Sequence, residues 1–461
     1  MRKNDSDRIS RRGTGRIAAA FAALVLASAP AGAETLTSAL SAAYSSNPDL
    51  NAARAGQRAT DEAVPQALSG WRPQVSATGT ITQSRTRFSS VSTVDLTNTQ
   101  VGVAVSQYLF RGFQTVNTTK QAEASVQAGR ASLSNTEQDT LFSAAQAYMN
   151  VLTDEAIVSL NKQNIEVLAE QLRATRDRFQ VGEVTNTDVA QSEAALSGAY
   201  TQLNQAEANL LSSKATYRQI IGREPQNLAP ATPAPNVPST LDEALRLGHA
   251  YHPAIISSVY SEEAAAYAVK TAEGALLPTV TLQGAATYDN NPSVLYDEGS
   301  AASITAQVTI PIYQGGSEYS AVREAKETRS QALLQVDSVR QQVRAAVVSA
   351  WGALQAATAS ISSAKAQVKA AQIALDGVRE EAKVGQRTTL DVLDAEQTLL
   401  DSKVSLVTAE SDRVVASYAL LSAIGSLTAQ KLALAVDYYQ PEVHYQQVRD
   451  KWFGLRTPSG Q

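Results

Sequence analysis

Two short segments of the chain, each following a glycine, place a threonine and an aspartate three residues apart. These residues are Gly182, Thr185 and Asp188 in the first segment and Gly385, Thr388 and Asp391 in the second. A hydroxyl followed by a carboxylate at this spacing is a helix-capping arrangement, and a helix N-terminus favours an anion. Asp394 adds a second carboxylate on the same helix face as Asp391. If several copies of the chain turned this face toward a common axis, these carboxylates would form a ring that favours cations.

The two segments differ in charge, and capping does not explain the difference. Asp394 corresponds to Gln191, and Arg387 corresponds to Val184, so only the second segment carries an arginine and a second aspartate. Taken by itself, Arg387 fits an ordinary surface salt bridge of little consequence for stability.

The rest of the sequence offers no catalytic or metal-binding constellation. It contains no Cys, 3 His and 2 Met, which excludes disulfides, thiol nucleophiles and Cys-ligated zinc. His249 and His252 form a short pair with no third ligand nearby in the sequence, and we expect a surface role for them ahead of a helix at Pro253. Neither a glycine-rich phosphate loop nor a Gly-x-Ser-x-Gly motif is present. We therefore expect no enzymatic activity, no cofactor and no metal.

The N-terminal 33 residues have the form of a secretory signal. Six basic residues precede an apolar stretch from Ile17 to Ser28, and Ala31-Gly32-Ala33 matches a cleavage site before Glu34. Cleavage there leaves 33 basic and 42 acidic side chains, a formal charge of −9. Such an acidic chain lacks the electrostatic footprint of a nucleic-acid-binding protein. No later apolar run reaches 18 residues, so we expect no helical membrane span.

The remainder of the chain is a tandem duplication. Leu36-Thr-Ser-Ala-Leu40 matches Leu241-Asp-Glu-Ala-Leu245 at an offset of 205 residues, and Gly222 matches Gly425 at an offset of 203. We assign repeat 1 to residues 34–223, a proline-rich linker to 224–240, repeat 2 to 241–430 and a C-terminal tail to 431–461.

Each repeat predicts the same order of elements. A helix is followed by alternating apolar and polar residues, which predict a β-hairpin at about 73–110 and again at about 278–313. Proline-free helical segments follow at about 114–180 and 317–383, then tip turns at 181–186 and 384–389, then return helices. Some 65 helical residues would extend about 100 Å, and a helix of that length needs coiled-coil partners.

Four strands cannot close a barrel, and membrane barrels begin at eight strands. An open sheet edge in lipid leaves unpaired backbone groups, so two or three chains must contribute strands if the sheet lies in a membrane. The apolar face, opposite small polar side chains, suits a wall with lipid on one side and water on the other.

The segment from Val384 to Leu399, which includes Asp-Val-Leu-Asp, resembles the TolC family of outer-membrane efflux and type I secretion channels. So do Gln107-Tyr-Leu-Phe-Arg-Gly112 and Ile310-Pro-Ile-Tyr-Gln-Gly-Gly316. The resemblance implies a homotrimer in the outer membrane, with a twelve-stranded β-barrel of four strands per chain that continues into a periplasmic α-helical barrel. It further implies a periplasmic adaptor and an inner-membrane pump, driven by protons or ATP, as partners. The channel would be the exit duct for small molecules, proteins or both.

The resemblance also assigns roles to the second tip. It implies that Asp391 and Asp394 line a periplasmic constriction, and that Arg387 locks the closed tip by bonding to Thr187 and Asp188. One departure from the family is Ala382, which stands where well-known members have a tyrosine.

The alternative function is an exported coiled-coil scaffold or adhesin that forms no channel, which the long helices alone would fit.

Overall fold

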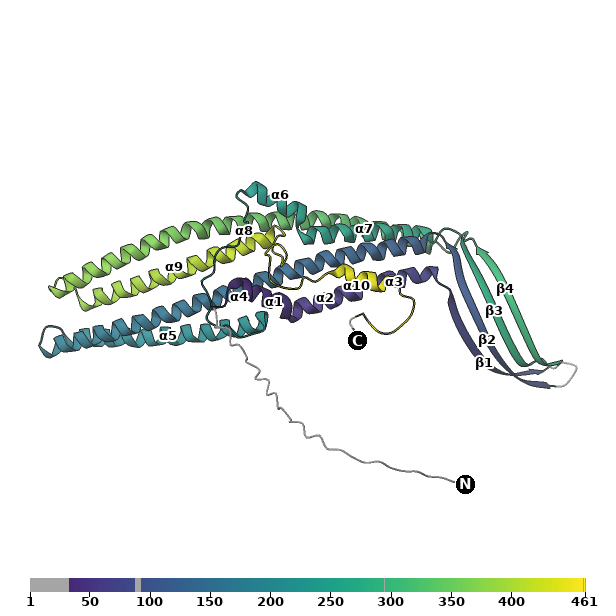
Figure 1. Ribbon diagram of the computed structural model, residues 1–461, viewed down its shortest axis with the longest axis horizontal. Coiled ribbons are helices and arrows are strands. Elements are labelled where there is room, and N and C mark those ends of the chain that lie inside the picture. Colours follow the sequence, from purple (N-terminus) through teal and green to yellow (C-terminus); the bar gives the residue numbers. More distant parts are fainter. Residues whose placement is uncertain (1–32, 88–92, 294, 459, 461) are drawn as a thin grey trace, which may run out of the picture.

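The computed structural model describes residues 33–87, 93–293, 295–458 and 460. Apart from Ala33, the predicted signal segment lies outside the described residues. Long helices run side by side along the molecule, with a β-sheet at one end and two helical tips at the other (Figure 1). Within the described residues, no helix is both long enough and apolar enough to cross a membrane.

The elements follow one another in the same order twice, which confirms the tandem repeat. The first repeat contains α1 (Leu36–Ser46), α2 (Pro48–Asp61), α3 (Ala63–Leu68), β1 (Gln74–Arg87), β2 (Thr93–Arg111), α4 (Gln114–Gln180) and α5 (Asn186–Ile221). The second contains α6 (Leu241–Tyr251), α7 (Pro253–Gly274), β3 (Thr279–Ser293), β4 (Tyr296–Thr309), α8 (Ser317–Lys383) and α9 (Thr389–Ala423). A short helix, α10 (Pro441–Val448), lies in the tail. Both long helices, α4 and α8, have 67 residues.

The two hairpins have the same strand register. Gln74 pairs with Ser106 in the first hairpin, and Thr279 pairs with Thr309 in the second. These are equivalent positions under the offsets of 205 and 203 residues. The duplication is therefore preserved in the individual pairs of residues that face each other across the strands.

The two hairpins join into one antiparallel sheet with the order β1-β2-β3-β4. The joining pair, β2 with β3, links the two repeats. Apolar side chains on this sheet are exposed, among them Ile81 at 76% and Ile304 at 84%. Within the described residues, β1 and β4 each have one unpaired edge, which in water is an adhesive surface.

A close backbone contact fixes the junction between sheet and helices. Gly112 follows β2 with a φ of +51°, and a Cβ built there would lie 2.1 Å from the carbonyl oxygen of Gly274. Only glycine combines that backbone conformation with such a close approach. The end of the first hairpin is thereby held against the end of α7.

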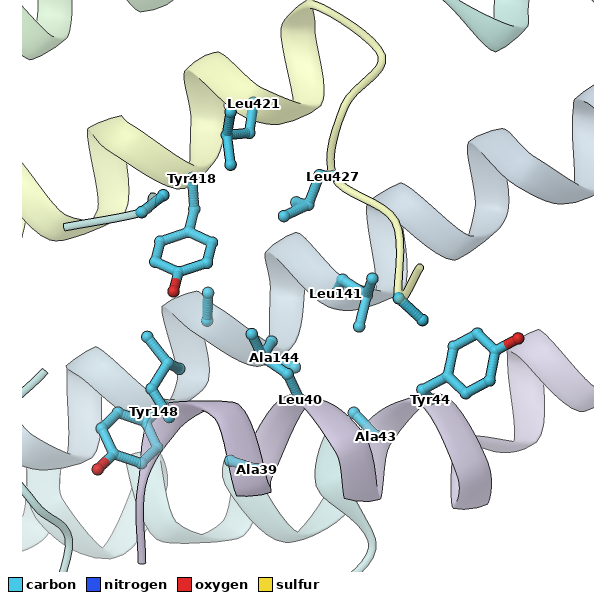
Figure 2. Close-up of a cluster of buried hydrophobic side chains, with 14 of the residues drawn as sticks. Ala39, Leu40, Ala43, Tyr44, Leu141, Ala144, Tyr148, Tyr418, Leu421 and Leu427 are labelled. Carbon is cyan, nitrogen blue, oxygen red and sulfur yellow. The ribbon is translucent and has the colours of Figure 1, made fainter. Parts of the chain in front are cut away.

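The main hydrophobic core lies midway along the helices rather than in the sheet. Figure 2 shows Leu40 of α1 beside Leu141 and Ala144 of α4, with Leu427 from the segment after α9 packed nearby. The segment after α9 continues over this region, where the Ala429 N–H donates to the Glu137 carboxylate at 2.7 Å. The C-terminal segment thus covers the groove between α1 and α4.

Glu34, the predicted first residue of the exported chain, is anchored to this core. The hydroxyl of Tyr148 donates to its carbonyl oxygen at 2.7 Å, and the hydroxyl of Tyr217 donates to its carboxylate at 2.7 Å. Burial of Tyr148 raises the pKa of its hydroxyl to about 12, so it remains a donor at physiological pH. Arg223 adds an ion pair to Glu34 at 2.6 Å.

Candidate functional site

Both tips turn through a glycine in the left-handed region. Gly182 has a φ of +80° and Gly385 a φ of +77°. In each turn the residue after the glycine donates its N–H back to the helix, from Glu183 to the carbonyl of Arg178 at 2.9 Å and from Gln386 to that of Glu381 at 3.0 Å. This is a standard glycine C-cap, which ends the long helix and sets the direction of the return helix.

The return helices begin with the same capping box. The Asp188 carboxylate accepts from the Thr185 N–H at 2.8 Å, and the Asp391 carboxylate accepts from the Thr388 N–H at 2.9 Å. The threonine hydroxyl in turn accepts from the aspartate N–H in both helices. The capping interpretation of both Thr-x-x-Asp segments is therefore correct as far as local structure goes.

These hydrogen bonds keep both aspartates ionised. The Thr185 hydroxyl and backbone N–H hold the pKa of the Asp188 carboxyl below its usual value. The Thr388 backbone N–H and hydroxyl do the same for the pKa of Asp391. A carboxylate whose hydrogen bonds favour its charged form stays negative well into the acidic range.

Asp188 also connects the two tips. In addition to its own cap, the hydroxyl of Thr389, which begins α9, contributes to holding the pKa of the Asp188 carboxyl below the usual value. Thr389 is buried. The first-repeat tip and the second-repeat tip are thus linked within one chain at the start of their return helices.

Arg387 has a partner that the sequence did not indicate. Its Nε donates to the Glu381 carboxylate at 2.8 Å, across the glycine turn, and both side chains are about half exposed. The hydrogen bond that Arg387 donates to the negatively charged Glu381, with a smaller contribution from the charge of Asp391, raises the pKa of Arg387. Among the described residues of this one chain, no hydrogen bond or ion pair joins Arg387 to Thr187 or Asp188.

The two carboxylates of the second tip are in different states. Asp391 is partly covered and engaged in its cap, whereas Asp394, one turn further along α9, is exposed. In the described part of the chain, the Asp394 carboxylate has neither a hydrogen bond nor an ion pair. It is therefore free to interact with a solute or with another copy.

A hollow lies beside the contact between the two coiled coils above the tips. It has a volume of about 820 Å³, lies between α4 and α8, and is lined by charged side chains of both signs, among them Glu170, Arg178, Arg379 and Lys383. Each coiled coil is closed by its own ion pairs, such as Arg176 with Glu193 at 2.6 Å in the first. The two coiled coils also pack on each other, through a buried apolar cluster that contains Leu168 and Leu393.

His252, one of the two neighbouring histidines, caps a helix. His252 Nδ1 accepts the Ala254 N–H at 3.2 Å and caps α7, and burial lowers the pKa of this imidazole. We predicted a surface role for His249 and His252 ahead of the helix at Pro253. For His252, that role is to cap the N-terminus of α7. Within the described residues, no group of three potential metal ligands occurs.

Comparison with known proteins gives a consistent family assignment. Residues 39–223 and 249–426, which cover both repeats, match the family described as outer membrane efflux protein. The chain is 46% identical over 437 residues to the outer membrane efflux protein BepC of Brucella suis biovar 1 (strain 1330), with 95% of each chain covered. It is 28% identical to the outer membrane protein TolC of Escherichia coli (strain K12), covering 87% of this chain and 84% of TolC.

Solved structures agree with the fold. The Campylobacter jejuni CmeC outer membrane channel superimposes with a TM-score of 0.78 at 17% identity, over 90% of this chain and 89% of CmeC. This likeness confirms the mainly helical architecture that ends in four strands. The chain therefore belongs to the outer membrane efflux protein family, the TolC family of outer-membrane channels that serve as exit ducts for export.

Proposed function

We propose that three copies of this chain join around one axis, closing a twelve-stranded barrel in the outer membrane and a helical tunnel in the periplasm. The observation that carries the proposal is the pair of unpaired sheet edges, β1 and β4, in the described part of the chain. In lipid, each unpaired backbone group costs several kcal/mol. Pairing β4 of one copy with β1 of the next gives the backbone groups of every strand edge a hydrogen-bond partner.

The tunnel is gated at the periplasmic tips. Arg387 of one copy bonds to Thr187 and Asp188 of the neighbouring copy, and the Asp391 and Asp394 carboxylates form the constriction. The exposure of Arg387, Thr187 and Asp394 supports this arrangement, because these groups are available to a second copy. A periplasmic adaptor and an inner-membrane pump then release the tip contacts when a substrate is delivered, and the pump selects between small molecules and proteins.

The assembly and the channel are tested together on the full chain extracted from outer membranes in detergent. We expect a native mass of three copies and discrete single-channel conductance steps in planar bilayers. An exported coiled-coil scaffold would instead be recovered as soluble periplasmic rods that leave the bilayer silent. That result, or a single-copy mass in the membrane extract, would contradict the proposal.

A further inference from the structure

Contacts in one repeat recur in the other at equivalent positions. Two ion pairs between the long helix and the return helix of repeat 1 reappear in repeat 2, each residue shifted by 203 positions. They are Arg176 with Glu193 and Lys162 with Glu207 in repeat 1, and Arg379 with Glu396 and Lys365 with Glu410 in repeat 2. Shifting both residues of an observed contact by the offset of the duplication therefore gives the two residues of the equivalent contact in the other repeat.

The rule extends to contacts between different helices. Arg329 of α8 bonds to Glu262 of α7 at 2.8 Å. Under the offsets of 203 and 205 residues, these positions become Val126 of α4 and Gln57 of α2. The side-chain amide of Gln57 does donate a hydrogen bond to the backbone carbonyl of Val126, at 3.4 Å. The packing of α7 on α8 thus repeats the packing of α2 on α4.

One class of contact has no equivalent inside a single chain. Helix α4 of repeat 1 packs on α7 of repeat 2, and the ammonium of Lys120 lies 5.7 Å from the centre of the Tyr267 ring. The equivalent positions are Arg323 on α8 and Glu62 at the end of α2. These two helices lie on opposite edges of the helical layer, with α4 and α7 between them (Figure 1).

Arg323 and Glu62 carry opposite charges, and both are available for an external partner. Arg323 is exposed and Glu62 is partly exposed. Within the described part of the chain, neither side chain takes part in an ion pair. We propose that Arg323 of one copy pairs with Glu62 of the neighbouring copy, so that α8 packs on the neighbour's α2 as α4 packs on α7. The inference rests on the trimer proposed above and adds its contacts.

A basic groove on α8 marks a second point on the same interface. A hollow of about 430 Å³ between α6 and α8 is lined by three arginines and His249, and otherwise by uncharged side chains: Arg246, Arg340, Arg344, Leu245, Gln341, Val343 and Val347. Arg340 pairs with Asp337 at 3.1 Å, but its Nε is buried and has no hydrogen-bond partner among the described residues. The groove thus combines arginine side chains and one unsatisfied donor with an apolar part.

The equivalent groove of repeat 1 shows how this one is filled. There, Leu427 of the segment after α9 and Leu141 of α4 belong to one buried apolar cluster (Figure 2). Shifted by 203 residues, Leu141 becomes Arg344 and Leu427 becomes Glu224. Two apolar members of one cluster within the chain are replaced by a base and an acid between chains. Glu224, whose exposed carboxylate pairs with Arg218 of its own chain at 2.9 Å, therefore lies opposite Arg344 of the neighbouring copy.

Exposed ion pairs are individually weak, so proximity tests this interface better than stability does. The chain contains no cysteine, and introduced thiols are therefore the only ones in the protein. We expect a short bifunctional maleimide to link copies of E62C/R323C, and separately copies of E224C/R344C, giving two-copy and three-copy bands in denaturing gels. Single-cysteine variants should give at most two-copy bands.

Exchanged pairs provide the matched control. Arg323 and Arg344 are 21 residues apart on one helix, or about 30 Å, so E62C/R344C and E224C/R323C should remain single-copy. If the native mass is three copies but the matched pairs fail to link, or the exchanged pairs link equally well, the interface assignment is wrong while the trimer stands. If only E62C/R323C links, the groove is not filled by the neighbour. A native mass of one copy removes the trimer itself.

Discussion

Replacing Arg387 with alanine is expected to raise the single-channel conductance of the reconstituted protein several-fold. Among the residues that the structure describes, Arg387 pairs with Glu381 alone, and its exposed side chain can reach the neighbouring tip. A single exposed ion pair contributes little. Three equivalent contacts around one axis act together, however, and their simultaneous loss shifts the balance from closed to open tips.

Two further variants separate a lock between copies from a local salt bridge. Arg178→Ala breaks a different ion pair across the first turn, Arg178 with Glu183 at 3.1 Å, and should leave the conductance unchanged. Glu381→Gln removes the partner of Arg387 within the chain but leaves the arginine able to reach the neighbour. If Glu381→Gln opens the channel as far as Arg387→Ala does, or if Arg387→Ala conducts no more than wild type, Arg387 is not the lock.

The second large effect is expected from removing both carboxylates of the second tip. Asp391→Ala combined with Asp394→Ala should abolish the block caused by trivalent cations added from the tip side of a planar bilayer. Rings of carboxylates attract multivalent cations. Because the Thr388 hydrogen bonds hold the pKa of Asp391 below its usual value, the wild-type block should persist down to mildly acidic pH and weaken only as the pH falls further.

The alanine at position 391 also removes a helix cap, so a gentler pair of substitutions serves as the control. Asp391→Asn with Asp394→Asn keeps a side-chain oxygen for capping while removing both charges. We expect the block to be lost in this variant as well, with an unchanged native mass. Undiminished block in the asparagine variant would place the two carboxylates away from the conducting path.

The local chemistry of the tips was predictable from the sequence, because it depends on neighbours along the chain. Gly385 and the Thr388 to Asp391 spacing specify a turn and a capping box, and both are present. The partner of Arg387 was missed. Glu381 lies six residues away, on the far side of a glycine turn, and no helical periodicity relates the two positions.

Contacts between the repeats were beyond sequence reasoning for a different reason. The joining of two hairpins through β2 and β3, and the covering of α1 and α4 by the segment around Leu427, link positions far apart in the chain. Apolar patterning shows that a face is buried but does not identify what buries it. The duplication supplies part of the missing information, since a contact seen once indicates where its equivalent lies.

This chain is the duct through which its host exports solutes, and the most direct test is export by living cells. A strain lacking the chain should accumulate a fluorescent efflux substrate, fail to release a secreted protein, or both, and the wild-type chain should restore what was lost. If the deletion changes neither accumulation nor secretion, while the protein is present in the outer membrane of the parent strain, the account is contradicted.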